Sequence, residues 1–182
     1  MAVPNLLAVF HLKVFSGYKL FDLGGKNFAY IGVTRKLNIN NERLNGFLKA
    51  LKNNDVIVPE ANIILNEKQQ TTRQLMDTLD VQKKKIDSIF CFNDQIAYEV
   101  IGYLSEKGIK VPEDINIIGF DNLQSAIIYP IKLTTIDADK PRAAHLALVS
   151  LFSKIKDSED TEVTGKIVDV TLVEGNTTKM RK

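Results

Sequence analysis

Two runs of sequence decide the fold: Phe90-Cys91-Phe92-Asn93-Asp94-Gln95-Ile96-Ala97 and Val111-Pro112-Glu113-Asp114-Ile115-Asn116-Ile117-Ile118-Gly119-Phe120-Asp121-Asn122. In each, an apolar stretch ends in polar residues. Residues 88–92 are expected to form a buried strand, and Asn93 is expected to cap the helix that follows. The isoleucines of the second run predict another strand, with Asp121 at its carboxyl end. Because open α/β sheets bind ligands at the carboxyl ends of their strands, Asn93 and Asp121 should lie side by side on a binding rim.

A helix is expected between these two strands. Its apolar residues recur at helical spacing and predict a buried face made of Ile96, Ala97, Val100, Ile101 and Leu104. Gly108 is suited to end this helix, since glycine adopts the left-handed conformation without steric cost. Strand, helix and strand together form one βαβ unit of a parallel sheet.

The same alternation extends over most of the chain from residue 26 onward. Strands are expected at residues 28–33 and 61–65, with helices at residues 44–51 and 67–79. This order predicts an α/β fold with a doubly wound parallel sheet covered on both faces. After Asp121, a short strand is expected at residues 133–137 and a last one at residues 167–173. Between them Pro141 should open a helix whose buried face comprises Ala144, Leu148, Leu151, Phe152 and Ile155.

Composition excludes several classes of protein. The chain has 182 residues and is 45% hydrophobic, which indicates a globular protein and not a disordered one. Its formal net charge of +2 provides no general attraction to nucleic acid or to a membrane. The single cysteine, Cys91, lies inside an apolar strand and is expected to be a core residue in a reducing compartment. The apolar start at residues 1–10 has no basic region before it, and His11 and Lys13 interrupt it too early for a membrane span, so a cytoplasmic protein is expected.

The two runs closely resemble the effector-binding domain of the lac/galactose-repressor (LacI/GalR) family of bacterial transcription regulators. The resemblance covers roughly residues 26–179 and rests on ordered pieces: Asn93-Asp94, Val111-Pro112-Glu113-Asp114, Gly119-Phe120-Asp121, residues 42–51, Leu133-Thr134-Thr135-Ile136 and residues 172–178. It implies a periplasmic-binding-protein-like fold of two lobes that hold a small-molecule effector between them. It also implies a homodimer that binds DNA through a helix-turn-helix module.

The resemblance predicts an incomplete pair of lobes, because only about 25 residues precede the first strand of the second lobe. We expect residues 1–25 to be a remnant of the first lobe or an atypical leader, and residues 26–130 to be the second lobe. Residues 131–165 would form a crossover segment, followed by a return strand and tail at residues 166–182. No stretch gives a helix-turn-helix with a basic recognition face, so DNA binding is expected only through a module absent from this chain. The helix after Pro141 would then need another apolar partner, either residues 6–15 or a second subunit.

Four residues are candidates for ligand binding. Arg43 matches the arginine of the family's Arg-x-x-Gly-aromatic motif and is expected on the exposed side of its helix, where a guanidinium could bind hydroxyls or a carboxylate. Without the resemblance, a solvated arginine would be the simpler interpretation. Asn93 can donate and accept hydrogen bonds, although it could serve only as a cap. Asp121 could bridge two hydroxyls or merely form a turn, and Phe92 could provide an apolar wall or belong to the core.

The ligand class stays open between a sugar, which we favour, and a purine. Some relatives place an aromatic residue where this chain has Asp139-Lys140, and the family usually has a basic residue at the position of Gly175. Asp94 is expected to be structural. These departures leave a pentose, a hexose or a purine compatible with the acid, amide and arginine set.

Catalysis has little support in the sequence. Neither of the two histidines, His11 and His145, lies near a cysteine or a carboxylate pair at metal-ligand spacing. Gly24-Gly25 precedes a strand instead of following one and is not a phosphate-binding loop. We therefore expect a binding protein without metal or cofactor and not an enzyme. Three alternatives are a solute-binding transport protein, a ligand-independent dimerisation module and a flavodoxin-like enzyme.

Overall fold

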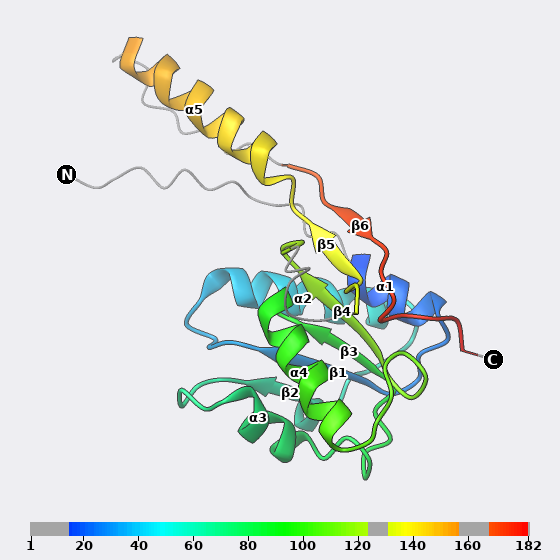
Figure 1. Cartoon of the computed structure of the whole chain (residues 1–182). Coiled ribbons are helices and arrows are strands. Elements are labelled where there is room, and N and C mark those ends of the chain that lie inside the picture. The colour runs from blue at the N-terminus through cyan, green and yellow to red at the C-terminus, as the bar shows by residue number, and fades with distance from the viewer. Residues whose placement is uncertain (1–14, 124–130, 157–167, 182) are drawn as a thin grey trace.

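The computed structural model describes residues 15–123, 131–156 and 168–181. Its sheet has six strands in the order β2-β1-β3-β4-β5-β6. Figure 1 shows their arrangement. The strands are β1 (Phe28–Gly32), β2 (Ile63–Leu65), β3 (Ser88–Cys91), β4 (Asn116–Phe120), β5 (Thr135–Asp137) and β6 (Thr171–Val173). The first five pair in parallel, and β6 runs antiparallel to β5. The predicted α/β fold class is confirmed.

Helices cover both faces of this sheet (Figure 1). The helices are α1 (Phe15–Asp22), α2 (Asn38–Lys52), α3 (Thr72–Leu79), α4 (Asp94–Glu106) and α5 (Lys140–Lys156). The first two pack on one face, while α3 and α4 pack on the other. No helix among the described residues is long and apolar enough to cross a lipid bilayer.

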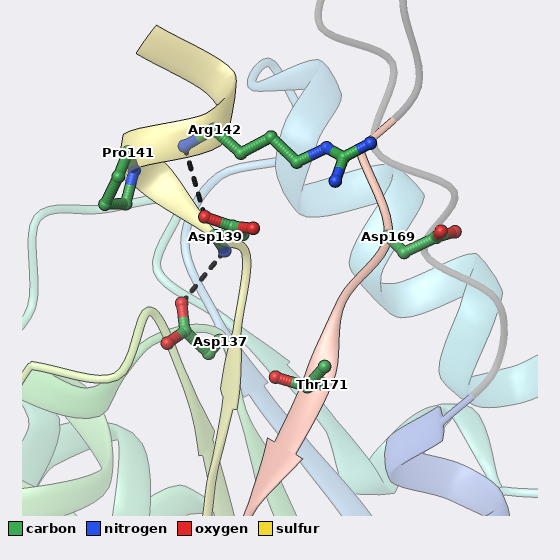
Figure 2. Close-up of a pocket in the computed structure, with 6 residues that line it drawn as sticks. All are labelled: Asp137, Asp139, Pro141, Arg142, Asp169 and Thr171. Carbon is green, nitrogen blue, oxygen red and sulfur yellow. Dashed lines mark hydrogen bonds between the residues drawn. The ribbon is translucent and has the colours of Figure 1, made fainter. Parts of the chain in front are cut away.

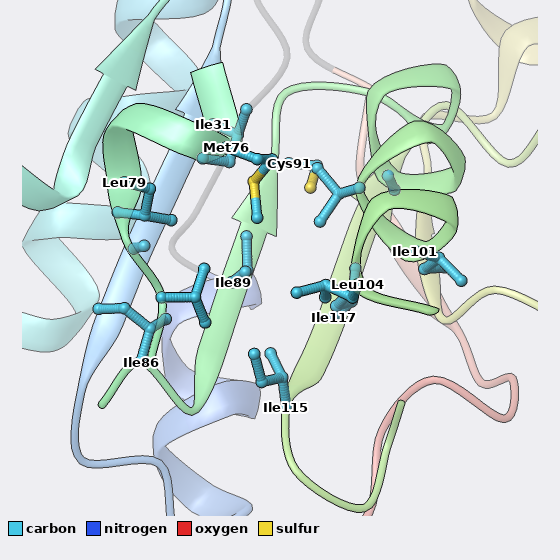
Figure 3. Close-up of a cluster of buried hydrophobic side chains, with 14 of the residues drawn as sticks. Ile31, Met76, Leu79, Ile86, Ile89, Cys91, Ile101, Leu104, Ile115 and Ile117 are labelled. Carbon is cyan, nitrogen blue, oxygen red and sulfur yellow. The ribbon is translucent and has the colours of Figure 1, made fainter. Parts of the chain in front are cut away.

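The α3/α4 face has an aliphatic core, shown in Figure 3. Strand residues such as Ile89 and Ile117 are fully buried against Leu79 and Leu104. Cys91 lies in this cluster as a buried free thiol, and its burial raises its pKa. The expectation that Cys91 is a core residue is confirmed.

The α1/α2 face has an aromatic core. The ring of Phe47 on α2 lies 6.5 Å from that of Phe28, 6.1 Å from Tyr30 and 5.6 Å from Phe90, measured between centroids. Edge-on and tilted arrangements of this kind are the ones that aromatic rings prefer. This cluster fixes α2 over the middle of the sheet and thereby positions Arg43 one turn before Phe47.

The start of α3 was predicted wrongly. A helix was expected from residue 67, but α3 begins at Thr72. Asn66 exchanges hydrogen bonds with the backbone of Gln70, and Gln69 has a φ of 53°, so these residues form a turn. Thr71 and Gln74 then make a capping box, which is a strong helix start.

Three strands begin later than expected, and one of them is β5, which begins at Thr135 and not at Leu133. β2 begins at Ile63, because residues 60–62 form a 3₁₀ turn, and β6 begins at Thr171. The first residue expected in the last strand, Ile167, lies outside the described residues.

Helix α5 forms as predicted, but its apolar residues are not buried. Leu148, Leu151, Phe152 and Ile155 are between 52% and 67% exposed, and Ala144 is exposed too. In Figure 1 the helix extends away from the sheet and covers neither face. Helical spacing correctly predicted an apolar face, but burial also requires an opposing surface, and the described part of the sheet provides none.

Replacing Phe152 and Ile155 together with serine is expected to reduce the fluorescence of anilinonaphthalene sulfonate bound to the native protein. The reason is that this dye binds exposed apolar surface, and α5 carries the largest run of such side chains among the described residues. Ile57→Ser is the matched control, since Ile57 is 86% exposed but isolated. Equal dye fluorescence in the double variant and the wild type would contradict the exposed placement of α5.

Candidate functional site

The candidate site lies at the carboxyl edge of the sheet, where β3 and β4 end next to each other. Asn93 follows β3 and Asp121 follows β4, and these strands pair in register from Ser88–Asn116 to Phe90–Ile118. The expectation that the two polar ends share one rim is confirmed. The third polar candidate, Arg43, reaches this rim from α2.

Arg43 is buried, although an exposed position was expected from the sequence. Only 9% of its side chain is accessible, because it lies on the same face of α2 as Leu44 and Phe47. Its Nη2 donates to Asp121 Oδ1 at 3.0 Å, and its Nη1 donates to the backbone oxygen of Phe92. A charged residue on a buried face needs such partners, and these lie far along the chain.

Two aromatic rings hold the guanidinium of Arg43. Its central carbon lies 3.8 Å from the centroid of the Phe120 ring and 4.5 Å from that of Phe92. Its Nε is buried without a hydrogen-bond partner among the described residues. Burial lowers the pKa of Arg43, and Asp121 opposes this effect. The predicted apolar wall, Phe92, therefore supports the arginine directly.

Asp121 is the more accessible member of this pair, with 31% of its side chain exposed. Its Oδ1 accepts from Arg43, and its backbone oxygen accepts from Nζ of Lys140. Among the described residues Oδ2 has no hydrogen bond, so it can accept from a ligand hydroxyl. Sequence reasoning missed Lys140 and Phe120, although Phe120 is the aromatic of the Gly-aromatic-Asp run.

Asn93 caps α4, as expected. Its Oδ1 accepts from the backbone nitrogen of Ile96 at 2.9 Å, and its backbone is extended, with a φ of −146°. The side chain is partly buried at the rim. This cap uses one lone pair of the amide oxygen, and a ligand contact through the rest of the amide stays a prediction.

Asp94 is buried beneath the rim and is 1% exposed. Its carboxylate accepts from the backbone nitrogen of Leu123 at 2.6 Å and from the hydroxyl of Thr135. Burial raises the pKa of Asp94 to about 6, and the nearby charge of Asp121 adds to this rise. The hydrogen bonds from Thr135 and Leu123 and the charge of Lys140 lower the pKa and so oppose it. The expected structural role of Asp94 agrees with these contacts.

Asp94→Asn is expected to flatten the pH dependence of stability and to stabilise the protein at neutral pH. The raised pKa means that the folded state favours the protonated form of Asp94. The stabilisation that protonation of Asp94 gives the folded state is complete below the ordinary pKa of 3.8, and it is lost as the pH rises through about 6. The variant should gain about 2 to 3 kcal/mol in free energy of unfolding relative to the wild type between about pH 4 and about pH 8. Urea unfolding at both pH values measures the difference, and a gain that is equal at both would contradict the buried, titrating carboxylate.

A polar pocket of about 390 Å³ lies next to the rim, between the end of β5, the start of α5 and β6 (Figure 2). Its lining includes Asp137, Asp139, Asp169 and Arg142. Asn122 Nδ2 donates to Asp137 at 2.8 Å and connects this pocket to the turn that carries Asp121. Within the described part of the chain no cluster of three or more histidine, cysteine or acidic side chains could hold a metal ion.

Gly175 has no room for a side chain in this backbone. A Cβ atom at this position would lie 2.3 Å from the backbone oxygen of Lys132 and 2.4 Å from the carbonyl carbon of Leu133. A basic side chain therefore does not fit here without movement of the backbone.

Most of the chain is similar to one protein family and to repressors that contain its domain. Residues 19–178 match the family model of the periplasmic binding protein-like domain. The chain is 36% identical over 138 residues to the HTH-type transcriptional repressor PurR of Actinobacillus pleuropneumoniae serotype 3 (strain JL03), covering 75% of this chain and 41% of that protein. It is 32% identical over 161 residues to PurR of Histophilus somni (strain 129Pt), covering 82% of this chain and 46% of that protein. The chain thus spans less than half the length of these curated relatives.

Solved structures of transcription regulators share the fold. A LacI transcriptional regulator from Bacillus cereus subsp. cytotoxis NVH 391-98 superimposes with a TM-score of 0.82 at 28% identity, covering 93% of this chain and 60% of that one. A LacI family regulator from Enterococcus faecium, solved with bound ribose, gives a TM-score of 0.76 at 25% identity, covering 93% of this chain and 62% of that one.

Proposed function

Because this chain belongs to the lac/galactose-repressor family of periplasmic binding protein-like domains, we propose that it is the ligand-sensing part of a bacterial transcription regulator. In this proposal residues 26–130 are the second lobe of an effector-binding domain, and residues 131–165 cross toward the first lobe. The protein acts as a cytoplasmic binder and homodimer, not as an enzyme. DNA is bound through a helix-turn-helix elsewhere in such a regulator.

The observation that carries the proposal is the Arg43–Asp121 pair on the rim. An arginine packed against two aromatic rings holds one carboxylate oxygen of Asp121, whose side chain is 31% exposed. A fixed acceptor beside an amide, Asn93, suits a ligand with adjacent hydroxyl groups. Rigid polar groups at the carboxyl ends of parallel strands are the usual ligand-binding arrangement of such sheets.

We propose a sugar as the effector, with a purine as the alternative. Asp121 can bridge two neighbouring hydroxyls of a sugar, while Asn93 donates to a third oxygen and Phe92 borders the ring. The ribose bound by the Enterococcus faecium regulator supports the sugar. The same carboxylate and amide can also bind the ring nitrogens of a purine. Direct binding measurements therefore distinguish a sugar effector from a purine effector.

Isothermal titration of the purified chain with ribose, glucose, cellobiose and adenine tests the proposal. Because only the second of two lobes is expected in this chain, we expect weak binding of one class of compound, and sub-micromolar affinity would show that the pocket is complete. Asp121→Asn should weaken that binding by about 10- to 100-fold, the effect of losing a charged hydrogen-bond acceptor. Asp169→Asn is the matched control, because this exposed carboxylate borders the neighbouring pocket and not the rim. Equal losses in both variants would contradict a site centred on Asp121.

Two other functions give different outcomes in further measurements. A solute-binding transport protein would bind a ligand but would form no mixed dimer with a full-length relative. A ligand-independent dimerisation module would form that mixed dimer and bind none of the compounds. Co-expression with a full-length relative, followed by size-exclusion chromatography, separates these two functions.

A further inference from the structure

We propose that Asp94, which is too deeply buried to touch a ligand, is a positioning residue that holds the turn Asp121–Leu123 and so directs the Asp121 carboxylate toward the rim. This inference rests on the proposed function, since it concerns how the effector site keeps its shape. It assigns Asp94 a part in binding that its place as the first residue of α4 would not require.

The turn carries backbone strain. Asp121 has a φ of 101° and Asn122 a φ of 47°, so two consecutive residues with side chains occupy the left-handed region. Such conformations persist only where the surrounding structure holds them, and they are frequent at ligand sites. The direction of the Asp121 side chain therefore depends on what holds this turn as well as on its contact with Arg43.

Asp94 holds the turn through both of its carboxylate oxygens. Oδ2 accepts from the backbone nitrogen of Leu123 at 2.6 Å, immediately after the strained pair. Oδ1 accepts from the hydroxyl of Thr135 on β5, and that hydroxyl oxygen accepts in turn from the backbone nitrogen of Asn122 at 3.4 Å. One carboxylate thus fixes the second residue of the turn through Thr135 and the third directly.

Gly119 provides the space for this arrangement. A Cβ atom at Gly119 would lie 2.3 Å from Asp94 Oδ1 and 2.8 Å from Leu133 Cδ2. Only a residue without a side chain on β4 lets the carboxylate pass over this strand and reach β5. Gly119 on β4 and Asp94 on α4 are therefore both needed for the contact with the Asp121 turn.

The burial of Asp94 disfavours its charged form, as its raised pKa shows. The contacts of Asp94 therefore stabilise the protein less at neutral pH than at acidic pH. Buried groups with shifted pKa values are characteristic of functional sites, which agrees with a role of Asp94 in shaping this one.

Amide hydrogen exchange of the full chain without ligand tests the inference, with Asp94→Ala, Asp94→Asn and Val100→Ala compared. We expect Asp94→Ala to speed exchange at Leu123 by about tenfold or more, because its amide loses its acceptor, and to speed exchange at Asn122 as well, because Thr135, which accepts from Asn122, loses the carboxylate that orients its hydroxyl. Asp94→Asn should stay near the wild type, since its amide oxygen can still accept from Leu123. Val100→Ala, a core truncation on the same helix, should leave these two amides unchanged relative to the rest of the sheet.

Titration with ribose and with adenine gives the second readout. Asp94→Ala should weaken binding by about tenfold or more, while Asp94→Asn should remain within about threefold of the wild type. Unchanged exchange at the turn in Asp94→Ala, or a loss of affinity no larger than that of Val100→Ala, overturns the inference. A wild-type chain that binds neither compound counts against the proposed function instead, and the exchange rates then decide the role of Asp94 by themselves.

Discussion

Asp121→Ala is expected to lower the free energy of unfolding by about 3 kcal/mol, because it leaves the Arg43 guanidinium buried without its carboxylate. Arg43 is 9% exposed and cannot turn into water without leaving the Phe92 and Phe120 rings. Urea unfolding followed by circular dichroism measures the loss. The midpoint should fall while the dependence on urea concentration stays constant.

The double variant Arg43→Met with Asp121→Ala is the control for this prediction. Methionine can fill the space between the two rings, so the double variant should recover most of the lost stability. Arg43→Met alone should cost less than Asp121→Ala, because the 31% exposed carboxylate of Asp121 can be hydrated when its partner is removed. The reverse order of these two losses would show that the pair is not the buried, desolvated contact described here.

Phe47→Ala is expected to cost about 3 to 5 kcal/mol of unfolding free energy, the usual result of emptying a buried aromatic site. The ring of Phe47 is 1% exposed and touches three other aromatic rings, so the cavity could not close without moving α2 over the sheet. Since α2 also carries Arg43, effector binding should fall together with stability. Denaturant unfolding and titration of the same sample measure both effects.

Lys49→Ala provides the matched control for Phe47→Ala. Lys49 lies on the exposed side of the same helix, and its replacement should change stability by less than about 0.5 kcal/mol. A loss below about 1 kcal/mol in Phe47→Ala would mean that the aromatic core does not determine the position of α2.

Much of the rim could be predicted from the sequence, because strand ends and caps depend on neighbouring residues. The Asn93 cap needs only the helix that follows it, and Asp121 follows β4 directly after the apolar residue Phe120. The two strands pair because they belong to one βαβ unit, so their ends meet without further information. The ligand contacts of these residues stay predictions.

The position of Arg43 could not be predicted in this way. Its carboxylate partner lies 78 residues later in the chain. Of the two rings that hold it, Phe92 follows β3 and Phe120 is the last residue of β4. Charged residues are usually exposed, so local reasoning placed Arg43 outside. The contacts of Asp94 with Leu123 and Thr135 depend on similarly distant segments.

Local sequence patterns were enough to predict the alternation of strands and helices from residue 26 onward, the α/β class, the buried thiol of Cys91 and the rim that carries Asn93 and Asp121. These features follow from apolar periodicity and local capping, which act over a few residues. The burial of Arg43, the contacts of Asp94 with the Asp121 turn and the exposure of the apolar face of α5 were apparent only from the folded chain. Burial and polar pairing depend on which distant surfaces meet, and no local pattern specifies the partner that a side chain finds after the chain has folded.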